Sequence, residues 1–163
     1  MEETIRIVRI SVRNLVEFIL REGDIDNRST GGPDKDAMLM GGRLHRRIQR
    51  RMGPEYHAEV SLKMLVPCGE FSVQIEGRAD GIIIKEDTGD VTVDEIKGVL
   101  RELTHIERPV NVHLAQAKCY AYIYAEQHGL GLIGVQMTYC NLDTEEVKRF
   151  SETYTKQELK VWF

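Results

Sequence analysis

The amino-acid sequence predicts an α/β fold in which helices flank a β-sheet. Three observations lead to this prediction. Apolar residues recur at helical spacing near the N-terminus, apolar and polar residues alternate along the middle of the chain, and a long helical segment then precedes two further strands. The chain has 163 residues, which is the length of one domain, so we expect a single domain over residues 1–163.

Two helices are expected in the first third of the chain. Apolar residues repeat with a helical period over residues 12–20, after Ser11 as a possible N-cap. Residues 24–33 are rich in Asp, Asn, Ser and Gly and predict a loop. A second helix should run over residues 34–52, because a Gly-Pro pair follows it and would stop it.

The middle of the chain predicts an antiparallel meander of three or four strands. Apolar residues alternate with polar ones over residues 58–66 and again over 71–75. A short run of isoleucines at 82–84 and the segment 91–97 follow, separated by a tight turn of Asp, Thr, Gly and Asp.

The last part of the chain predicts a helix, two strands and the start of another helix. The helix should span residues 112–128, and residues 132–140 and 147–154 should form a strand pair. Thr155 and Glu158 form a capping box, which opens a helix, but only five residues follow it. Because so short a helix is unstable alone, we expect the sequence to be part of a longer protein.

Composition excludes several classes of protein. The net charge is −4, so the chain as a whole lacks the excess positive charge of many nucleic-acid binders. No apolar stretch is long enough for a membrane helix, and the N-terminus lacks the apolar core of a secretory signal. The three cysteines, Cys68, Cys119 and Cys140, are far apart and predict neither a disulfide framework nor a zinc site. We therefore expect a cytoplasmic protein.

Three charged residues stand at the end of a predicted β-hairpin. Asp80 precedes the isoleucine run, and Glu95 and Lys97 close the strand that begins at residue 91. Residues two apart on a strand share a face, so Glu95 and Lys97 should point the same way. Only one turn separates the two strands, so Asp80 should lie beside them.

Two adjacent carboxylates repel each other unless a cation lies between them. A hard cation such as Mg²⁺ suits oxygen ligands of this kind, and a nearby lysine can orient an attacking water. These residue types together favour hydrolysis of a phosphodiester. Taken singly, however, Asp80 between two glycines could be a turn residue, and Glu95 and Lys97 could be an exposed ion pair.

Asp80 followed by Glu95-Ile96-Lys97 resembles the signature of PD-(D/E)XK nucleases, and other residues resemble their RecB-like branch. That branch carries a histidine on an upstream helix, which His45 matches, and a Gln-x-x-x-Tyr motif on the helix after the lysine. The strand glutamate of the family looks like Glu59. The Gln-x-x-x-Tyr motif is matched by Gln116 and Tyr120. The resemblance covers roughly residues 11–140.

The resemblance implies a role for each of these residues. Asp80, Glu95, the carbonyl of Ile96 and His45 would bind the metal, and Lys97 would position the attacking water. Glu59 would act as a supporting acid or bind a second metal. Gln116 and Tyr120 would brace the site or contact DNA, although they could also simply close the core by hydrogen bonding.

The resemblance also implies a fold and an activity. The fold would be restriction-endonuclease-like, with a central mixed β-sheet flanked by helices. The protein would be an Mg²⁺- or Mn²⁺-dependent deoxyribonuclease, an exonuclease acting on DNA ends in repair or recombination. The wording of residues 11–26 resembles nuclease domains that precede DinG-like DNA helicases, which implies a covalently linked helicase as partner. The alternatives are a catalytically silent DNA-binding module of a helicase and an RNA-directed nuclease of the same fold.

Two features depart from the family pattern. Some RecB-like nucleases hold an iron–sulfur cluster through four cysteines, and the three cysteines here lack that arrangement, so no cluster is expected. Asp94 stands directly before the glutamate of the signature. It should point to the other face of the strand, although a bulge could exchange it with Glu95.

Five arginines fall within nine residues of the second predicted helix. Arg43, Arg47 and Arg50 share one side at helical spacing, and we expect them to contact DNA phosphates. The alternative is an ordinary solvated helix face.

Overall fold

The computed structural model describes residues 4–20 and 35–163, so the predicted loop at 24–33 lies outside the described residues. In chain order the elements are β1 (Arg6–Ser11), α1 (Val12–Ile19), α2 (Lys35–Arg51), β2 (Tyr56–Cys68), β3 (Phe71–Ile84), β4 (Val91–Val99), the 3-10 turn η1 (Leu103–His105), α3 (Asn111–His128), β5 (Leu132–Asn141), β6 (Val147–Thr155) and α4 (Lys156–Trp162).

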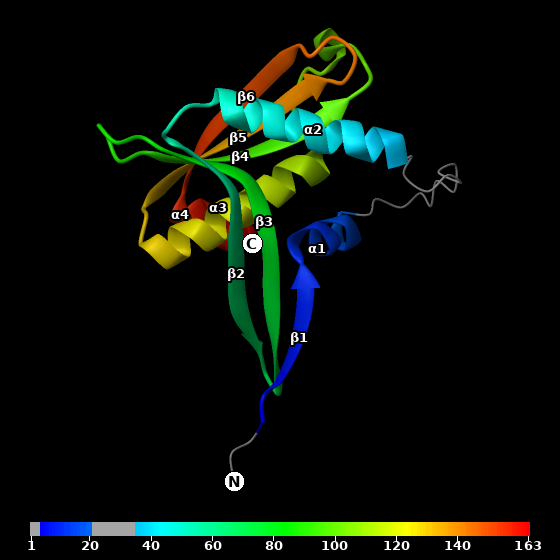
Figure 1. The fold of residues 1–163 in the computed structure, drawn as a ribbon. Helices are drawn as coiled ribbons and strands as arrows, with labels where there is room; N and C mark the ends of the chain where they lie inside the picture. The colour runs from blue at the N-terminus through cyan, green and yellow to red at the C-terminus, as the bar shows by residue number, and fades with distance from the viewer. Residues whose placement is uncertain (1–3, 21–34) are drawn as a thin grey trace.

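The six strands form one mixed sheet. Its order is β1-β3-β4-β5-β6, and β2 pairs with β3 beside this path. The predicted meander is present, because β2, β3 and β4 pair antiparallel, as do β5 and β6. β1 with β3 and β4 with β5 are parallel pairs. Figure 1 shows β1, β2 and β3 extending away from the rest of the sheet as a long ribbon.

Helices pack on both faces of the sheet, so the expected α/β class with a central mixed sheet is confirmed. Val93, Val135 and Met137 belong to the main core, which also contains residues of α1, α3 and α4. On the opposite face Ile96 and Cys140 form a smaller core with two residues of α2, Leu44 and Ile48. Figure 1 shows α2 and α3 on opposite sides of the sheet.

Local signals in the sequence explain where the helices begin and end. The side chain of Ser11 accepts a hydrogen bond from the backbone N–H of Asn14 and caps α1, and Gly129 ends α3 in a left-handed conformation with φ of 63°. The predicted capping box of Thr155 and Glu158 opens α4. α4 has only 7 residues, but its Leu159 is 0% exposed, so burial supports the helix that propensity alone would not.

The structure differs from the expected elements in two places. β1 was not expected, and β3 is one continuous strand where the sequence predicted two short ones. Among the described residues, no helix combines the length and the apolar character that crossing a bilayer requires.

Candidate active site

The candidate site lies at a fork in the sheet. β2 pairs with one edge of β3 along almost its whole length. The other edge of β3 is shared, because β1 pairs with residues 71–76 and β4 pairs with residues 81–84. Residues 77–80 of that edge pair with neither strand. On this edge the backbone groups of residues 77–80 have no strand partner, so side chains can bond to them.

Asp80 spans this gap from β3 to β4. Its Oδ2 accepts a hydrogen bond of 2.7 Å from the backbone N–H of Ile96. The carboxylate thus links the two strands at a position where their backbones do not pair. Its Oδ1 lies 3.5 Å from Nδ1 of His45, which reaches over from α2. The structure brings Asp80 next to the Glu95-Ile96-Lys97 segment, as the spacing predicted, and it also brings in His45, which the family resemblance implied. The metal-binding roles of His45 and of the Ile96 carbonyl stay predictions.

Glu95 is a buried carboxylate with an incomplete set of partners. It is 2% exposed, and its Oε1 lies 3.1 Å from Nζ of Lys97. Its Oε2 is buried and accepts no hydrogen bond from the described part of the chain. Burial, and next the negative charge of Asp80, raise the pKa of Glu95 to about 8, against a lowering by Lys97. A buried carboxylate oxygen without a donor costs free energy, so this site favours a cation.

Lys97 connects this carboxylate to α3. Its Nζ donates to Oε1 of Gln116 at 3.3 Å, and Nε2 of Gln116 lies 3.5 Å from the hydroxyl of Tyr120. Gln116 and Tyr120 are only 9% and 3% exposed. Of the two predicted roles, this geometry supports bracing the lysine. Direct contact with DNA by Gln116 and Tyr120 stays a prediction, and their burial leaves little surface for it.

Asp94 points to the opposite face of β4, as the alternation of a strand predicts. β4 pairs with β5 without interruption from Thr92 to Val99, so no bulge exchanges Asp94 with Glu95. Asp94 is 0% exposed and accepts hydrogen bonds from the Tyr56 hydroxyl at 2.7 Å, from Thr138 Oγ1 at 2.6 Å and from Gln136 Nε2 at 3.1 Å. Its donors are complete, which separates it chemically from Glu95.

Glu59 lies on β2, opposite Asp80 of β3, and its carboxylate has partners of its own. Its Oε2 lies 2.7 Å from Nε of Arg78, and its Oε1 accepts from Nε2 of Gln49 at 2.9 Å. The residue is exposed and adopts a positive φ of 58°. Its predicted role as a supporting acid or ligand of a second metal stays a prediction. Gln49 was missed by sequence reasoning, and its only available signal is its position one turn after His45.

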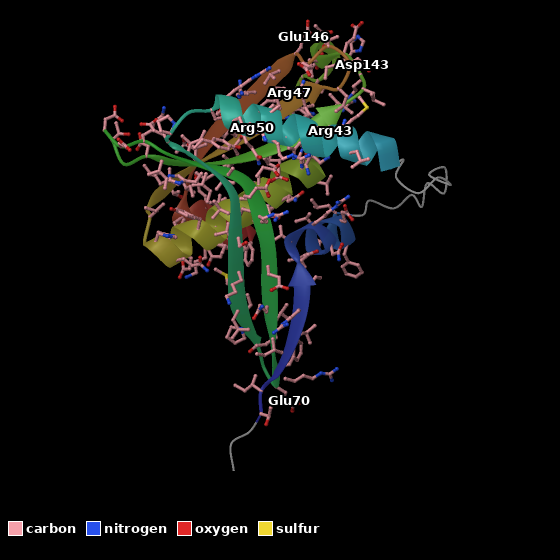
Figure 2. The ribbon with its side chains drawn as sticks, viewed as in Figure 1. Arg43, Arg47, Arg50, Glu70, Asp143 and Glu146 are labelled. Atoms are coloured by element: carbon pink, nitrogen blue, oxygen red, sulfur yellow. The ribbon has the colours of Figure 1, made fainter. Side chains whose placement is uncertain are left out.

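The three arginines expected to contact DNA lie on the side of α2 that is turned away from Asp80. At 100° per residue, Arg43, Arg47 and Arg50 fall opposite to the side of His45. Arg47 forms an ion pair with Glu145, in the turn between β5 and β6. Figure 2 shows the three arginines along α2, with Asp143 and Glu146 near that turn and Glu70 at the far tip of the ribbon. Contact between these arginines and DNA stays a prediction. It would require the DNA to pass over α2.

Two carboxylates of the site fit a hard divalent cation. Within residues 4–20 and 35–163, no three His, Cys, Asp or Glu side chains are grouped closely enough to hold a metal as they stand. Mg²⁺, however, is commonly bound through one or two carboxylates while it keeps several waters. Asp80 and Glu95 supply that number, and the buried Oε2 of Glu95 still needs a positive partner. The donor set therefore fits Mg²⁺ or Mn²⁺.

Comparison with solved structures supports the fold. SSO0001 aligns over 93% of this chain and 71% of its own chain, with 19% identity and a TM-score of 0.59. An alkaline exonuclease from Laribacter hongkongensis aligns over 94% of this chain and 82% of its own, with 16% identity and a TM-score of 0.46. The first likeness shows a shared fold alone. No protein-family model and no curated protein sequence matches the chain.

Proposed function

We propose that this chain is a metal-dependent nuclease domain with the restriction-endonuclease-like fold, and that Asp80, Glu95 and Lys97 form its active site. The observation that carries the proposal is the buried Oε2 of Glu95, which has no partner among the described residues and stands beside a second carboxylate and a lysine. A carboxylate placed in this way destabilises the fold unless a cation completes it. Perturbed acids of this kind gather at functional sites.

The two carboxylates would hold the cation, with His45 and the Ile96 carbonyl as further expected ligands. A bound Mg²⁺ would act as a Lewis acid that stabilises the negative charge developing on a phosphate oxygen. The hydrogen bond from the N–H of Ile96 to Oδ2 of Asp80 supports this role, because it restricts the orientation of the carboxylate. The remaining steps are carried by the side chains of the chain itself.

Lys97 would orient the water that attacks the phosphorus. Its ammonium group is held between Glu95 Oε1 and Gln116 Oε1, so two of its three hydrogens are committed and the third can donate to a water. Gln116 in turn is held by Tyr120. Fixing the lysine in this way reduces the entropy that must be lost when the water and the phosphate align.

The particular function that we propose is that of a RecB-like exonuclease that digests DNA from its ends in repair or recombination. The resemblance of residues 11–26 to the segment that precedes DinG-like helicases supports a linked helicase as its partner. His45 on the upstream helix and the Gln116–Tyr120 pair support the RecB-like branch.

The test is digestion of a linear duplex labelled at one end, beside a closed circle of the same sequence and a matched RNA strand, in Mg²⁺ or EDTA. The proposal predicts Mg²⁺-dependent loss of the linear DNA and an intact circle. Cleavage of RNA in preference to DNA would make the protein a ribonuclease of the same fold. DNA binding without cleavage of any strand would instead make it a silent binding module.

A further inference from the structure

One rung of the β2–β3 ladder is missing beside the candidate site. The two strands pair residue by residue from Tyr56 and Ile83 to Cys68 and Phe71, and the flanking pairs Ala58–Gly81 and Val60–Ala79 are present. The residues between these pairs are Glu59 and Asp80, which do not pair. Glu59 has a φ of 58°, a left-handed conformation that residues with a Cβ atom rarely adopt.

The side-chain amide of Gln49 donates hydrogen bonds to both residues at this break. Its Nε2 donates to the backbone carbonyl of Asp80 at 2.9 Å and to the Oε1 of Glu59 at 2.9 Å. An amide nitrogen carries two hydrogens, so both are used. A side chain of α2 therefore supplies the hydrogen bond to the Asp80 carbonyl that a neighbouring strand would ordinarily supply.

We propose that Gln49 is a positioning residue that fixes the backbone of Asp80, so that the carboxylate of Asp80 points at the metal site. The proposal rests on the proposed function, because it concerns the same metal site. Gln49 is not among the residues that match the nuclease signature.

Two hydrogen bonds and one close contact with a histidine then hold Asp80 from three directions. Gln49 holds its carbonyl, the N–H of Ile96 holds Oδ2, and Nδ1 of His45 lies 3.5 Å from Oδ1. His45 and Gln49 are four residues apart and so lie on the same side of α2. One helix thus contacts both the backbone and the side chain of the same acid. Without the hydrogen bond from Gln49, the backbone at Asp80 would be less constrained, and the carboxylate would turn away from the proposed metal site.

The test measures Mn²⁺ affinity by titration calorimetry, without DNA, beside DNA cleavage and thermal unfolding. The variants are Gln49→Met, which removes both hydrogen bonds, and Glu59→Ala, which removes the contacts of Glu59 with Gln49 and Arg78 but leaves the donor for the Asp80 carbonyl in place. Gln127→Met is the matched control, because Gln127 also donates from a helix to a strand carbonyl, that of Lys63, away from the site. Gln49→Asn, one methylene group too short to reach, is the second variant if Gln49→Met does not fold.

We expect Gln49→Met to weaken Mn²⁺ binding by about tenfold or more, as loss of a group that orients a ligand commonly does. Glu59→Ala should weaken it less, and Gln127→Met should leave it unchanged. A Gln49→Met change that causes no further loss in a Glu59→Ala background would mean that Gln49 acts through Glu59, which overturns the proposal. Equal losses in Gln127→Met would reduce the effect to general stability and overturn it too.

The same experiment separates failure of this inference from failure of the proposed function. Wild-type protein that binds Mn²⁺ and cleaves DNA, with a Gln49→Met variant that does both equally well, overturns the positioning role alone. Wild-type protein that neither binds Mn²⁺ nor cleaves overturns the proposed function, and the positioning role falls with it.

Discussion

Glu95 shows how folding and the proposed chemistry oppose each other at one residue. Its pKa is raised to about 8 by burial and by Asp80, so the folded protein holds the proton of this group more tightly than the unfolded chain does. The stability that this group contributes is therefore full below the ordinary pKa of a glutamate, and it is lost as the pH rises through about 8. A bound cation would remove this cost.

We expect Glu95→Gln to be more stable than wild type at pH 8.5 in EDTA, by at least about 1 kcal/mol, because an ionised buried group is removed. Added Mn²⁺ should raise the unfolding temperature of wild type but not of the variant, since a ligand stabilises only the form that binds it. Urea and thermal unfolding measure both effects. A variant less stable than wild type under these conditions would refute the assignment of a cost to Glu95.

His113 gives a second, independent pH dependence. Burial, and then the positive charges of Lys97, Arg101 and Arg13, lower its pKa from 6.5 to about 4. Its Nδ1 lies 3.2 Å from the hydroxyl of Tyr139. Stability due to neutral His113 is therefore present above about pH 6.5 and is lost as the pH falls toward 4.

Between pH 7.5 and pH 4.5 we expect wild type to lose more of its free energy of unfolding than His113→Gln, which cannot titrate. Urea unfolding of both proteins at the two pH values measures the difference. Equal losses in the two proteins would show that His113 does not resist protonation in the folded state.

At the level of residues, the sequence predicted which residues of the candidate site share a face of a strand. Glu95 and Lys97 are two apart and Asp94 lies between them, so their faces follow from strand geometry alone. The partners of these residues did not follow. Gln49 was missed because its role depends on the missing rung at Glu59, and no local pattern predicts a left-handed glutamate inside a strand.

Among the elements, β2, β4 and β5 are joined by the hydrogen bonds of Asp94. Tyr56 comes from β2, and Thr138 and Gln136 come from β5. The ring of Tyr56 occupies the space that a side chain at Gly81 would need, so any larger residue there would have to displace that ring. Burial raises the pKa of Asp94, and its three donors oppose that rise. This network holds β4 in the register that sends Glu95 and Lys97 toward α3.

Tyr56→Phe should lower the free energy of unfolding by about 1–3 kcal/mol, because it leaves a buried carboxylate oxygen of Asp94 without a donor. The matched control is Tyr154→Phe, since the Tyr154 hydroxyl also contacts a carboxylate, that of Glu152, but in an exposed position. The control should change stability little. Similar losses in the two variants, measured by urea unfolding, would mean that burial of Asp94 does not set the cost.

The elements that sequence reasoning missed depend on pairing between distant segments. Most residues of β1 are exposed. It pairs in parallel with β3, and a long stretch of chain separates the end of β1 at Ser11 from the start of β3 at Phe71. Its isoleucines and valine favour a strand, but six residues interrupted by arginine show no regular alternation that would mark one. The helices were predicted better, because capping residues and helical periodicity are local.

Across the whole molecule, α4 closes the core on the α3 side of the sheet. Leu159 is 0% exposed and belongs to the main core, and Lys118 of α3 lies 4.2 Å from the ring centre of Trp162. We expect Leu159→Ala to cost about 2–5 kcal/mol, as other buried leucines do. Leu100→Ala is the control, because Leu100 is 69% exposed. A small loss for Leu159→Ala in urea unfolding would contradict the docking of α4.

The fold class could be predicted from the order of helices and strands, but the fork that creates the site could not. The gap arises because β1 and β4 share one edge of β3, and that arrangement appears only once β1 is placed. Two expectations stay predictions. One is that the sequence is part of a longer protein, and the other is that a helicase is linked to it.

The most direct measurement is cleavage of end-labelled linear DNA by wild type and by Lys97→Ala, in Mg²⁺, Mn²⁺ or EDTA, with thermal unfolding to confirm that both proteins are folded. The arrangement of Asp80, Glu95 and Lys97 predicts metal-dependent digestion by wild type and a loss of at least about 100-fold in the variant. Digestion by Lys97→Ala at the rate of wild type, or digestion that persists in EDTA, would contradict the proposed active site.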